Sequence, residues 1–228
     1  MAEIRDGKLI FKVATYNIAA QYYCPNDPDV IGRDIANTDA DIVGLQEVDM
    51  FMKRTGERDM LAEIAAVAGY PHRRFIRALE YKGGHYGTAI LSKHPIEDLE
   101  IIPLPSFDEN RSVGRFVINL LGERINYFNT HLTCVPEEVP SHIELVAKIL
   151  DKYNSYVITG DFNNNNFERF DAFHGHRLAI NAENNFPDFA GIDNIIMTED
   201  FDYSDRYLGP EDHSDHRMLV ATLTKELK

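Results

Sequence analysis

The fold is decided by the stretch Ser155-Tyr156-Val157-Ile158-Thr159-Gly160-Asp161-Phe162-Asn163, in which an apolar, β-prone segment runs into a polar turn. The pattern predicts a short strand over residues 156–159. The turn presents the carboxylate of Asp161 and the carboxamide of Asn163, and residues two apart in extended backbone point to the same side. Such a pair can hold an attacking water and a phosphate oxygen. Glycine, aspartate and asparagine also gather in ordinary turns, so the rest of the sequence must distinguish the two interpretations.

At 228 residues the chain could form one large or two small domains, and because no repeat or linker appears along it, we expect a single domain spanning residues 1–228. The chain is 44% hydrophobic and long enough to bury a substantial core. Its formal net charge of −14 argues against a protein that depends on general attraction to nucleic-acid phosphates, although a bound divalent metal would offset negative charge locally. No apolar segment approaches the roughly 18 residues of a membrane span, and the charged N-terminus does not resemble a signal peptide. We therefore expect a cytoplasmic location.

Many strands and few helices are predicted. Besides the strand over residues 156–159, apolar runs predict strands over residues 9–18, 40–48, 73–79, 86–91, 99–104, 115–121, 124–131, 191–197 and 218–223. Gly122-Glu123 is expected to be a two-residue hairpin connection. Helical patterns cover residues 29–38 and 59–68, and a polar loop is expected between residues 51 and 58.

A third helix is predicted from a capping-box pattern. Ser141 is expected at the N-cap and Glu144 at the third helical position, with the helix running to Lys152.

Polar side chains recur where the predicted strands end. They are, in chain order, Asn17, Glu47, His131, Asp161, Asn163, Asp193, Asp215 and His216. Each alone has an ordinary explanation as a turn residue, a strand-edge charge or a satisfied histidine. Six separate strand ends that all carry such groups indicate one shared site.

The residue types of this set suggest a chemistry. Carboxylate and carboxamide oxygens suit Mg²⁺ or Mn²⁺ rather than zinc, and Mg²⁺ usually keeps room for a substrate phosphate. A histidine beside a carboxylate supplies a proton donor or a stabilising cation. The set predicts metal-assisted hydrolysis of a phosphate ester. Neither a Gly-x-x-x-x-Gly-Lys loop nor a Gly-x-Ser-x-Gly elbow occurs, which argues against P-loop and serine-nucleophile chemistry. Arg54 and Arg111 are candidate phosphate contacts, with ordinary surface arginines as the alternative.

Seven short blocks stand in a fixed order within residues 9–222. They are Thr15-Tyr16-Asn17-Ile18, Leu45-Gln46-Glu47-Val48, Tyr86-Gly87-Thr88-Ala89-Ile90-Leu91-Ser92, Asn129-Thr130-His131-Leu132, Gly160-Asp161-Phe162-Asn163, Ile192-Asp193-Asn194-Ile195 and Ser214-Asp215-His216. This ordered set resembles the endonuclease/exonuclease/phosphatase superfamily, which includes deoxyribonuclease I, exonuclease III, inositol polyphosphate 5-phosphatases and neutral sphingomyelinases. The resemblance implies a four-layer α/β sandwich of two mixed β-sheets face to face, flanked by helices, with the site at one end.

The resemblance also implies a metal side of the site. Glu47 resembles the principal metal ligand, with Asn17 close to it. Asp215 resembles a further carboxylate on the metal side, and Mg²⁺ or Mn²⁺ is the implied cofactor.

On the catalytic side, the resemblance implies that Asp161 orients or deprotonates the attacking water and that Asn163 holds water or phosphate. Asp193 and His216 resemble the Asp–His pair at the scissile phosphate. His131 resembles the histidine that stabilises or protonates the leaving group.

Two positions depart from the pattern of the superfamily. His85 stands where some members carry a glutamate that can pair with the histidine matched by His131. We expect that a His–His arrangement cannot orient His131 as a carboxylate would. Arg217 and Met218 follow His216, and Met218 stands where a proline is usual.

The preferred function is a metal-dependent hydrolase of a small or lipid-like phosphoester, whether a diester or a monoester. The alternative is a DNA or RNA nuclease, for which residues 71–82 offer a basic cluster with interleaved aromatic residues. A non-catalytic binding module is a third possibility. The substrate, the number of metals and the oligomeric state are left open by the sequence.

Overall fold

The computed structural model describes residues 1–24, 27–178, 184–186, 189–210 and 212–227. Most of its strands belong to two large mixed sheets. The seven-stranded sheet contains β1 (Glu3–Arg5), β2 (Lys8–Asn17), β3 (Ile42–Met50), β4 (His72–Tyr81), β5 (Gly84–Ser92), β14 (Phe201–Leu208) and β15 (Leu219–Glu226). The six-stranded sheet contains β6 (Ile96–Leu104), β7 (Arg111–Leu120), β8 (Glu123–His131), β9 (Val157–Asp161), β10 (His176–Leu178) and β13 (Asp193–Thr198). A short separate hairpin consists of β11 (Asn184–Phe186) and β12 (Phe189–Ala190).

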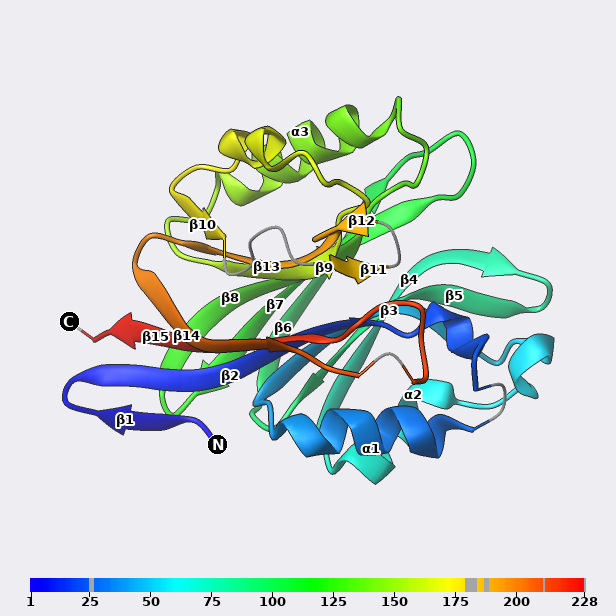
Figure 1. Ribbon diagram of the computed structural model, residues 1–228, viewed down its shortest axis with the longest axis horizontal. Helices are drawn as coiled ribbons and strands as arrows, with labels where there is room; N and C mark the ends of the chain where they lie inside the picture. The colour runs from blue at the N-terminus through cyan, green and yellow to red at the C-terminus, as the bar shows by residue number, and fades with distance from the viewer. Residues whose placement is uncertain (25–26, 179–183, 187–188, 211, 228) are drawn as a thin grey trace.

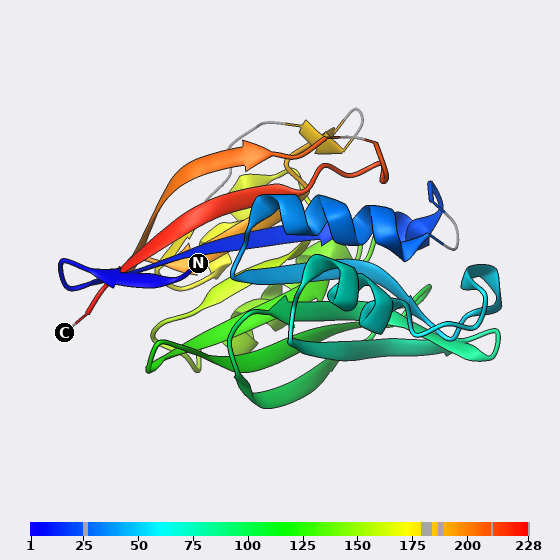
Figure 2. The ribbon, with the colours of Figure 1, turned by 90° about the horizontal axis from the view of Figure 1, so that it is seen from below.

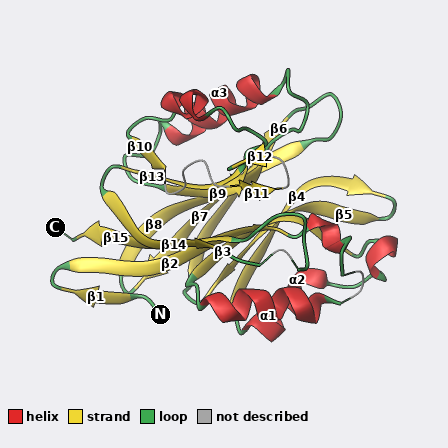
Figure 3. Cartoon of the chain, viewed as in Figure 1, coloured by secondary structure: helices red, strands yellow, loops and turns green. Residues whose placement is uncertain are grey.

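The two sheets pack face to face, with helices on their outer faces (Figure 1). Helices α1 (Pro28–Thr38) and α2 (Met60–Ala68) cover the seven-stranded sheet, and Figure 2 shows them lying over one face of its strands. Helix α3 (Val139–Leu150) covers the six-stranded sheet, so that the helices of Figure 3 lie on opposite sides of the strands. This arrangement confirms the predicted four-layer α/β sandwich. None of the helices in the described part of the chain is long and apolar enough to cross a membrane.

Alternation along the strands separates the hydrophobic layers. In β2, Phe11 and Val13 belong to the cluster between the sheets, whereas Ala14 and Tyr16 pack on the side of α1 and α2. Because side chains of a strand alternate between faces, a strand buried on both sides reads as a continuous apolar run. The third hydrophobic cluster joins α3 to the outer face of the six-stranded sheet.

Among the described strands, each large sheet contains one parallel pair, and these two pairs position several of the strand-end residues. Strands β2 and β3 are parallel, with Asn17 opposite Gln46. Strands β8 and β9 are parallel, with His131 opposite Asp161. Parallel neighbours need a crossover connection, which α1 supplies in the first pair and α3 in the second. The carboxyl ends of all four strands thereby carry polar groups.

A buried amide joins the two sheets between these pairs. Asn129 of β8 is fully buried, and its Nδ2 donates to the backbone oxygens of Leu45 (3.0 Å) and Ala89 (2.9 Å) in the opposite sheet. Its Oδ1 accepts hydrogen bonds from Gln46 Nε2 (2.8 Å) and Thr159 Oγ1 (3.1 Å). All four hydrogen-bonding positions of the carboxamide are therefore used.

The predicted helices 29–38 and 59–68 are confirmed to within one residue, but the third helix was wrong at both ends. Helix α3 begins at Val139 because Pro140 fits the first helical turn, where no backbone N–H is needed. Ser141 is therefore inside the helix, where its Oγ donates to Glu138 O (2.7 Å) instead of forming a capping box. The helix ends at Leu150, before the predicted Lys152.

Several strand and turn boundaries also differ from the prediction. The connection between β7 and β8 is Leu121-Gly122, because both residues have positive φ, as a tight hairpin turn requires, and Glu123 pairs with Leu120. Within the predicted loop 51–58, Lys53–Thr55 forms a 3₁₀ turn. Strand β14 was not predicted, because most of its residues are exposed and polar.

Candidate active site

Glu47 lies at a β-bulge in β3. The pairing of β3 with β5 shifts register between Leu45 and Val48, and Glu47 has a φ of 57°. Left-handed backbone is unfavourable for a residue with a side chain and persists only where the surroundings impose it. On the other side of β5, Gly87 allows β4 to approach closely, since a Cβ at Gly87 would lie 2.1 Å from Ile76 O. The Glu47 side chain lines three adjoining cavities at this end of the sandwich.

Asn17 connects the carboxylates of the two sheets. Its Nδ2 donates to Glu47 Oε1 (3.2 Å) and to Asp161 Oδ2 (3.0 Å), while its Oδ1 accepts the Ala19 amide (2.9 Å). The side chain is fully buried. One carboxamide therefore fixes the position of Glu47 relative to Asp161, although these residues belong to different sheets.

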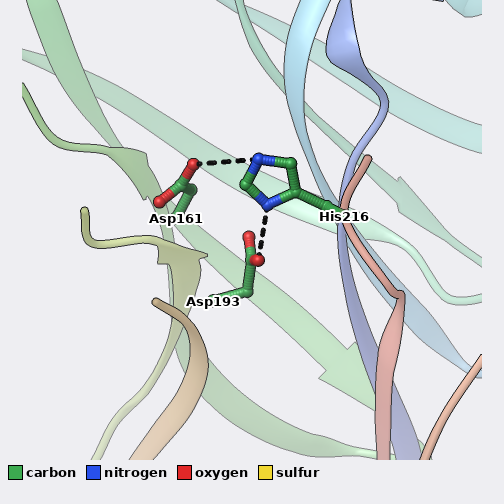
Figure 4. A group of neighbouring side chains, drawn as sticks. All are labelled: Asp161, Asp193 and His216. Atoms are coloured by element: carbon green, nitrogen blue, oxygen red, sulfur yellow. Dashed lines mark hydrogen bonds and ion pairs between the residues drawn. The ribbon is translucent and has the colours of Figure 1, made fainter. Parts of the chain in front are cut away.

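Asp161, Asp193 and His216 form a buried group (Figure 4). His216 Nδ1 donates to Asp193 Oδ2 at 2.7 Å, and its Nε2 lies 3.8 Å from Asp161 Oδ2. The two aspartates are directly opposite each other in the antiparallel pair of β9 and β13. Sequence reasoning named all three residues, and the structure brings them together.

Burial and charge shift the pKa values of this group. Burial alone would lower the pKa of His216, but the charge and hydrogen bond of Asp193, with Asp161 and Asp215 nearby, raise it to about 10. Burial, together with the negative charge of Asp193, raises the pKa of Asp161 to about 6. At neutral pH, His216 is thus a cation, and Asp161 is a carboxylate whose pKa is close to the range useful for a general base.

His131 faces Asp161 from the neighbouring strand. Its Nε2 lies 3.4 Å from Asp161 Oδ2, and its Nδ1 lies 3.2 Å from Arg111 Nη1. Burial, Arg111 and His216 lower the pKa of His131 well below its ordinary value. The expected His–His arrangement with His85 is wrong, because the partner at Nδ1 is Arg111. His85 lies instead 3.9 Å from Glu80 Oε1.

Asn163 forms an ordinary Asx turn and also lines the candidate site. Its backbone N–H donates to Asp161 Oδ1 (2.9 Å), which is the hydrogen bond of an Asx turn. Its Nδ2 donates to Leu132 O (3.0 Å), and the residue lines the same cavity as Asp161. The turn therefore shapes the site instead of competing with a functional role.

Asp215 and the two candidate arginines also lie at the cavities. Asp215 lines two of the three cavities that Glu47 lines, and Arg111 also lines two, one of which it has in common with Asp215. Arg54 lines two of the Glu47 cavities, yet its guanidinium is already engaged by both oxygens of buried Asp49, at 2.6 Å each. A phosphate contact from either arginine stays a prediction.

The cavity that contains most of the predicted residues has a volume of about 650 Å³. Its lining residues are Glu47, Arg111, His131, Cys134, Pro136, Val139, Asp161, Asn163, Asn164, Asn165, Arg169, Ile192, Asp215 and His216. An adjoining cavity of about 640 Å³ extends past Glu47 and Arg111 toward Tyr81 and Asp108. The basic cluster in residues 71–82 does not reach these two cavities through Arg73, Arg77 or Lys82, because none of these residues lines either of them.

The model of the Endonuclease/Exonuclease/phosphatase family matches residues 14–216. The chain belongs to this family. Its members are phosphoesterase hydrolases, and the match runs from the strand that carries Asn17 to His216 itself. Among curated proteins, no relative matches the sequence significantly.

Several solved structures have the same fold at low sequence identity. An endonuclease/exonuclease/phosphatase from Beutenbergia cavernae is 22% identical, with a TM-score of 0.80, over 95% of this chain and 72% of that one. A mannosyl-6-phosphatase from Bacteroides thetaiotaomicron is 19% identical, with a TM-score of 0.70, over 93% and 99%. The 2′,3′-cyclic phosphatase ANGEL2 is 14% identical, with a TM-score of 0.73, over 100% and 99%.

The residues at Glu47 fit the divalent metal that family members commonly use. Burial and the nearby charge of Asp161 raise the pKa of Glu47, so a cation beside it would relieve an unfavourable concentration of negative charge. Carboxylate donors suit hard cations such as Mg²⁺ or Mn²⁺. The group of Asp161, Asp193 and His216 also has its ligand atoms within 4.8 Å of one another. In that group, however, the Nδ1–H of His216 already donates to Asp193, so these two atoms are not both available to a metal ion.

Two residues of the site were missed by sequence reasoning. Asp49 holds Arg54, and Glu109 Oε1 lies 2.6 Å from Arg111 Nη1. Asp49 follows the bulge inside a strand that was predicted to end at residue 48. Glu109 lies in a loop that follows no predicted site strand, so no sequence signal pointed to it.

Proposed function

We propose that this chain is a divalent-metal-dependent hydrolase of phosphate esters. The observation that carries the proposal is the contact of Asn17 with both Glu47 and Asp161. The fully buried amide of Asn17 donates to both carboxylates, of which Glu47 is suited to bind a metal and Asp161 to act as a general base. Hydrolysis of a phosphate ester needs these two functions next to each other.

Glu47 and Asp215 would hold the metal, and Asn17 contributes a donated hydrogen bond to Glu47. When bound there, Mg²⁺ or Mn²⁺ would polarise a phosphoryl oxygen and offset the charge of the substrate. The substrate phosphate would lie in the cavity lined by Glu47, Asp161 and His216.

Asp161 would accept the proton of the attacking water, because it is ionised at neutral pH and lines the cavity. His216 would stabilise negative charge on the phosphoryl oxygens through Nε2–H, while Asp193 holds the ring by Nδ1. Asn163 would hold the water or a phosphate oxygen at the rim. His131 would donate a hydrogen bond on the side of the leaving group.

A small or lipid-like substrate is favoured over a nucleic acid. The net charge is −14, and the basic residues Arg73, Arg77 and Lys82 do not line the two main cavities. Two of the structural neighbours are described as a mannosyl-6-phosphatase and a 2′,3′-cyclic phosphatase, which fits small phosphoesters as substrates. A nuclease is the alternative, and a non-catalytic binding module is disfavoured because every candidate catalytic position carries a competent side chain.

The test is hydrolysis of a set of phosphodiesters and phosphomonoesters, alongside plasmid nicking, with Mg²⁺, Mn²⁺ or a chelator. We expect activity on small esters that requires metal and falls by about 10²-fold or more in Asp161→Asn and Glu47→Gln. Glu144→Gln, an exposed carboxylate on α3, is the matched control. Activity that survives chelation and both substitutions would refute the mechanism. Efficient and steeply salt-dependent nicking of plasmid DNA would indicate that the substrate is a nucleic acid and not a small ester.

A further inference from the structure

Arg111 is a buried arginine whose hydrogen bonds stay within the protein. Only 6% of the residue is exposed, and it begins β7 opposite Leu104. Its Nη1 lies 2.6 Å from Glu109 Oε1 and 3.2 Å from His131 Nδ1, and the Tyr86 side chain is a further hydrogen-bond partner. Glu109 and His131 both contact Nη1, whereas the buried Nε has no hydrogen-bond partner, and Glu109 balances the charge of the guanidinium.

The contact with Arg111 determines which nitrogen of His131 carries the proton. A guanidinium has N–H donors and no acceptor. His131 Nδ1 must therefore accept the hydrogen bond, which leaves the proton of the neutral ring on Nε2. A doubly protonated ring would direct Nδ1–H at an N–H of Arg111 and would bring two positive charges together in a buried site.

The other side of the ring faces the cavity. His131 Nε2 lies 3.4 Å from Asp161 Oδ2, and the charged groups around the ring are Arg111, Asp161 and His216. An N–H at Nε2 can donate to Asp161 or to an oxygen of a bound substrate.

We propose that Arg111 is a positioning residue that fixes His131 as a neutral Nε2–H hydrogen-bond donor, so that His131 stabilises the departing oxygen, which leaves as an oxyanion and takes its proton from water and not from His131. The lowered pKa of His131 agrees with this assignment. Arg111 thereby acts through His131 and not as a phosphate contact. The catalytic part of the inference rests on the proposed function, whereas the tautomer does not.

The tautomer is measured on the metal-free protein with ¹⁵N-labelled histidine, by long-range ¹H–¹⁵N correlation across neutral pH. His131 is assigned by the signal that His131→Gln removes. We expect a single Nε2–H tautomer in the wild type. Arg111→Met keeps the length of the aliphatic stem but removes the donor, and we expect it to populate both tautomers. Arg111→Lys restores a donor and the single tautomer.

A matched control is Arg54→Met, which removes another arginine of the cavity wall that is bound to Asp49 and not to His131. It leaves the His131 signal unchanged. An Nδ1–H or doubly protonated His131 in the wild type would overturn the proposal without any variant. Persistence of the Nε2–H tautomer in folded Arg111→Met would overturn the role of Arg111.

Kinetics separates positioning from phosphate binding. With the best substrate of the ester set, Arg111→Met should lower kcat about tenfold or more, with little change in KM, and Arg111→Lys should recover most of kcat. A raised KM with unchanged kcat would identify a phosphate contact instead. If no phosphoester is hydrolysed, the proposed function fails, while the NMR result still decides the tautomer.

Discussion

Replacing Asn129 with alanine tests whether the buried amide between the sheets holds the two halves of the site together. The substitution leaves two backbone carbonyls, Gln46 Nε2 and Thr159 Oγ1 without the partner that they have at 2.8–3.1 Å. An orphaned buried polar group costs about 1–3 kcal/mol, and neighbours compensate in part. We therefore expect a loss of about 3–5 kcal/mol from a free energy of unfolding that is about 5–15 kcal/mol for a typical domain.

The assay is urea unfolding followed by circular dichroism, with the control Asn126→Ala. Asn126 lies on the same strand but is half-buried, with hydrogen bonds to Arg115 and Ser155, so its loss should cost about 1 kcal/mol. Activity should fall in Asn129→Ala even where the protein is fully folded, because the amide ties β3 to the sheet that carries Asp161. A cost equal to that of the control, with an unchanged m value, would refute the reasoning.

Three further predictions concern charge and reactivity. Asp41 is fully buried, which would raise its pKa, but hydrogen bonds from His94 and two backbone amides hold the pKa below the ordinary 3.8. The ionised carboxylate therefore contributes fully to folding stability above pH 3.8, and this contribution is lost as the pH falls through the pKa of the folded state. Asp41→Asn should thus lower the urea midpoint more at pH 7 than at pH 3, and equal effects at both would contradict this. Asp193→Asn should bring the pKa of His216 down from about 10 toward its ordinary 6.5, as NMR titration would show; an unmoved titration would mean that Asp193 is not the main cause. Exposed Cys134 lines the cavity, whereas Cys24 is buried and its pKa is raised to about 11, so a maleimide should react first at Cys134 and inhibit hydrolysis. Cys134→Ser should protect the protein, and inhibition of that variant at the same rate would contradict the prediction.

Strands buried on both faces could be predicted from their continuous apolar runs, and β4 and β6 were also predicted although many of their residues are exposed. Continuous apolar runs located β2, β3 and β9 because both faces of these strands are covered. Strand β14 was not predicted because its exposed residues do not form an apolar run. The start of α3 was misplaced because Pro140 and Ser141 each signal a helix start, and the proline determined the outcome.

Residue types predicted the site, but its internal contacts required the fold. Strand ends indicated Asp161 and Asp193, because Asp161 ends β9 and Asp193 begins β13, which runs antiparallel beside it, and His216 was indicated by its place just before the last strand. The contact of Arg111 with His131 depends on how β7 pairs with β8, and no local pattern encodes it. Asn129 belongs to one of the seven ordered blocks but was given no role there, and only the fold shows that its amide lies between the sheets.

The left-handed backbone of Glu47 sets function against stability at one position. Replacing Glu47 with glycine would relieve the unfavourable φ and also remove a buried carboxylate, so the variant should unfold at a higher temperature than the wild type in the absence of metal. The same variant would have no carboxylate to offer a cation. A library of this protein screened for heat resistance alone would therefore be expected to lose Glu47 early, and the most robust survivors would be inert.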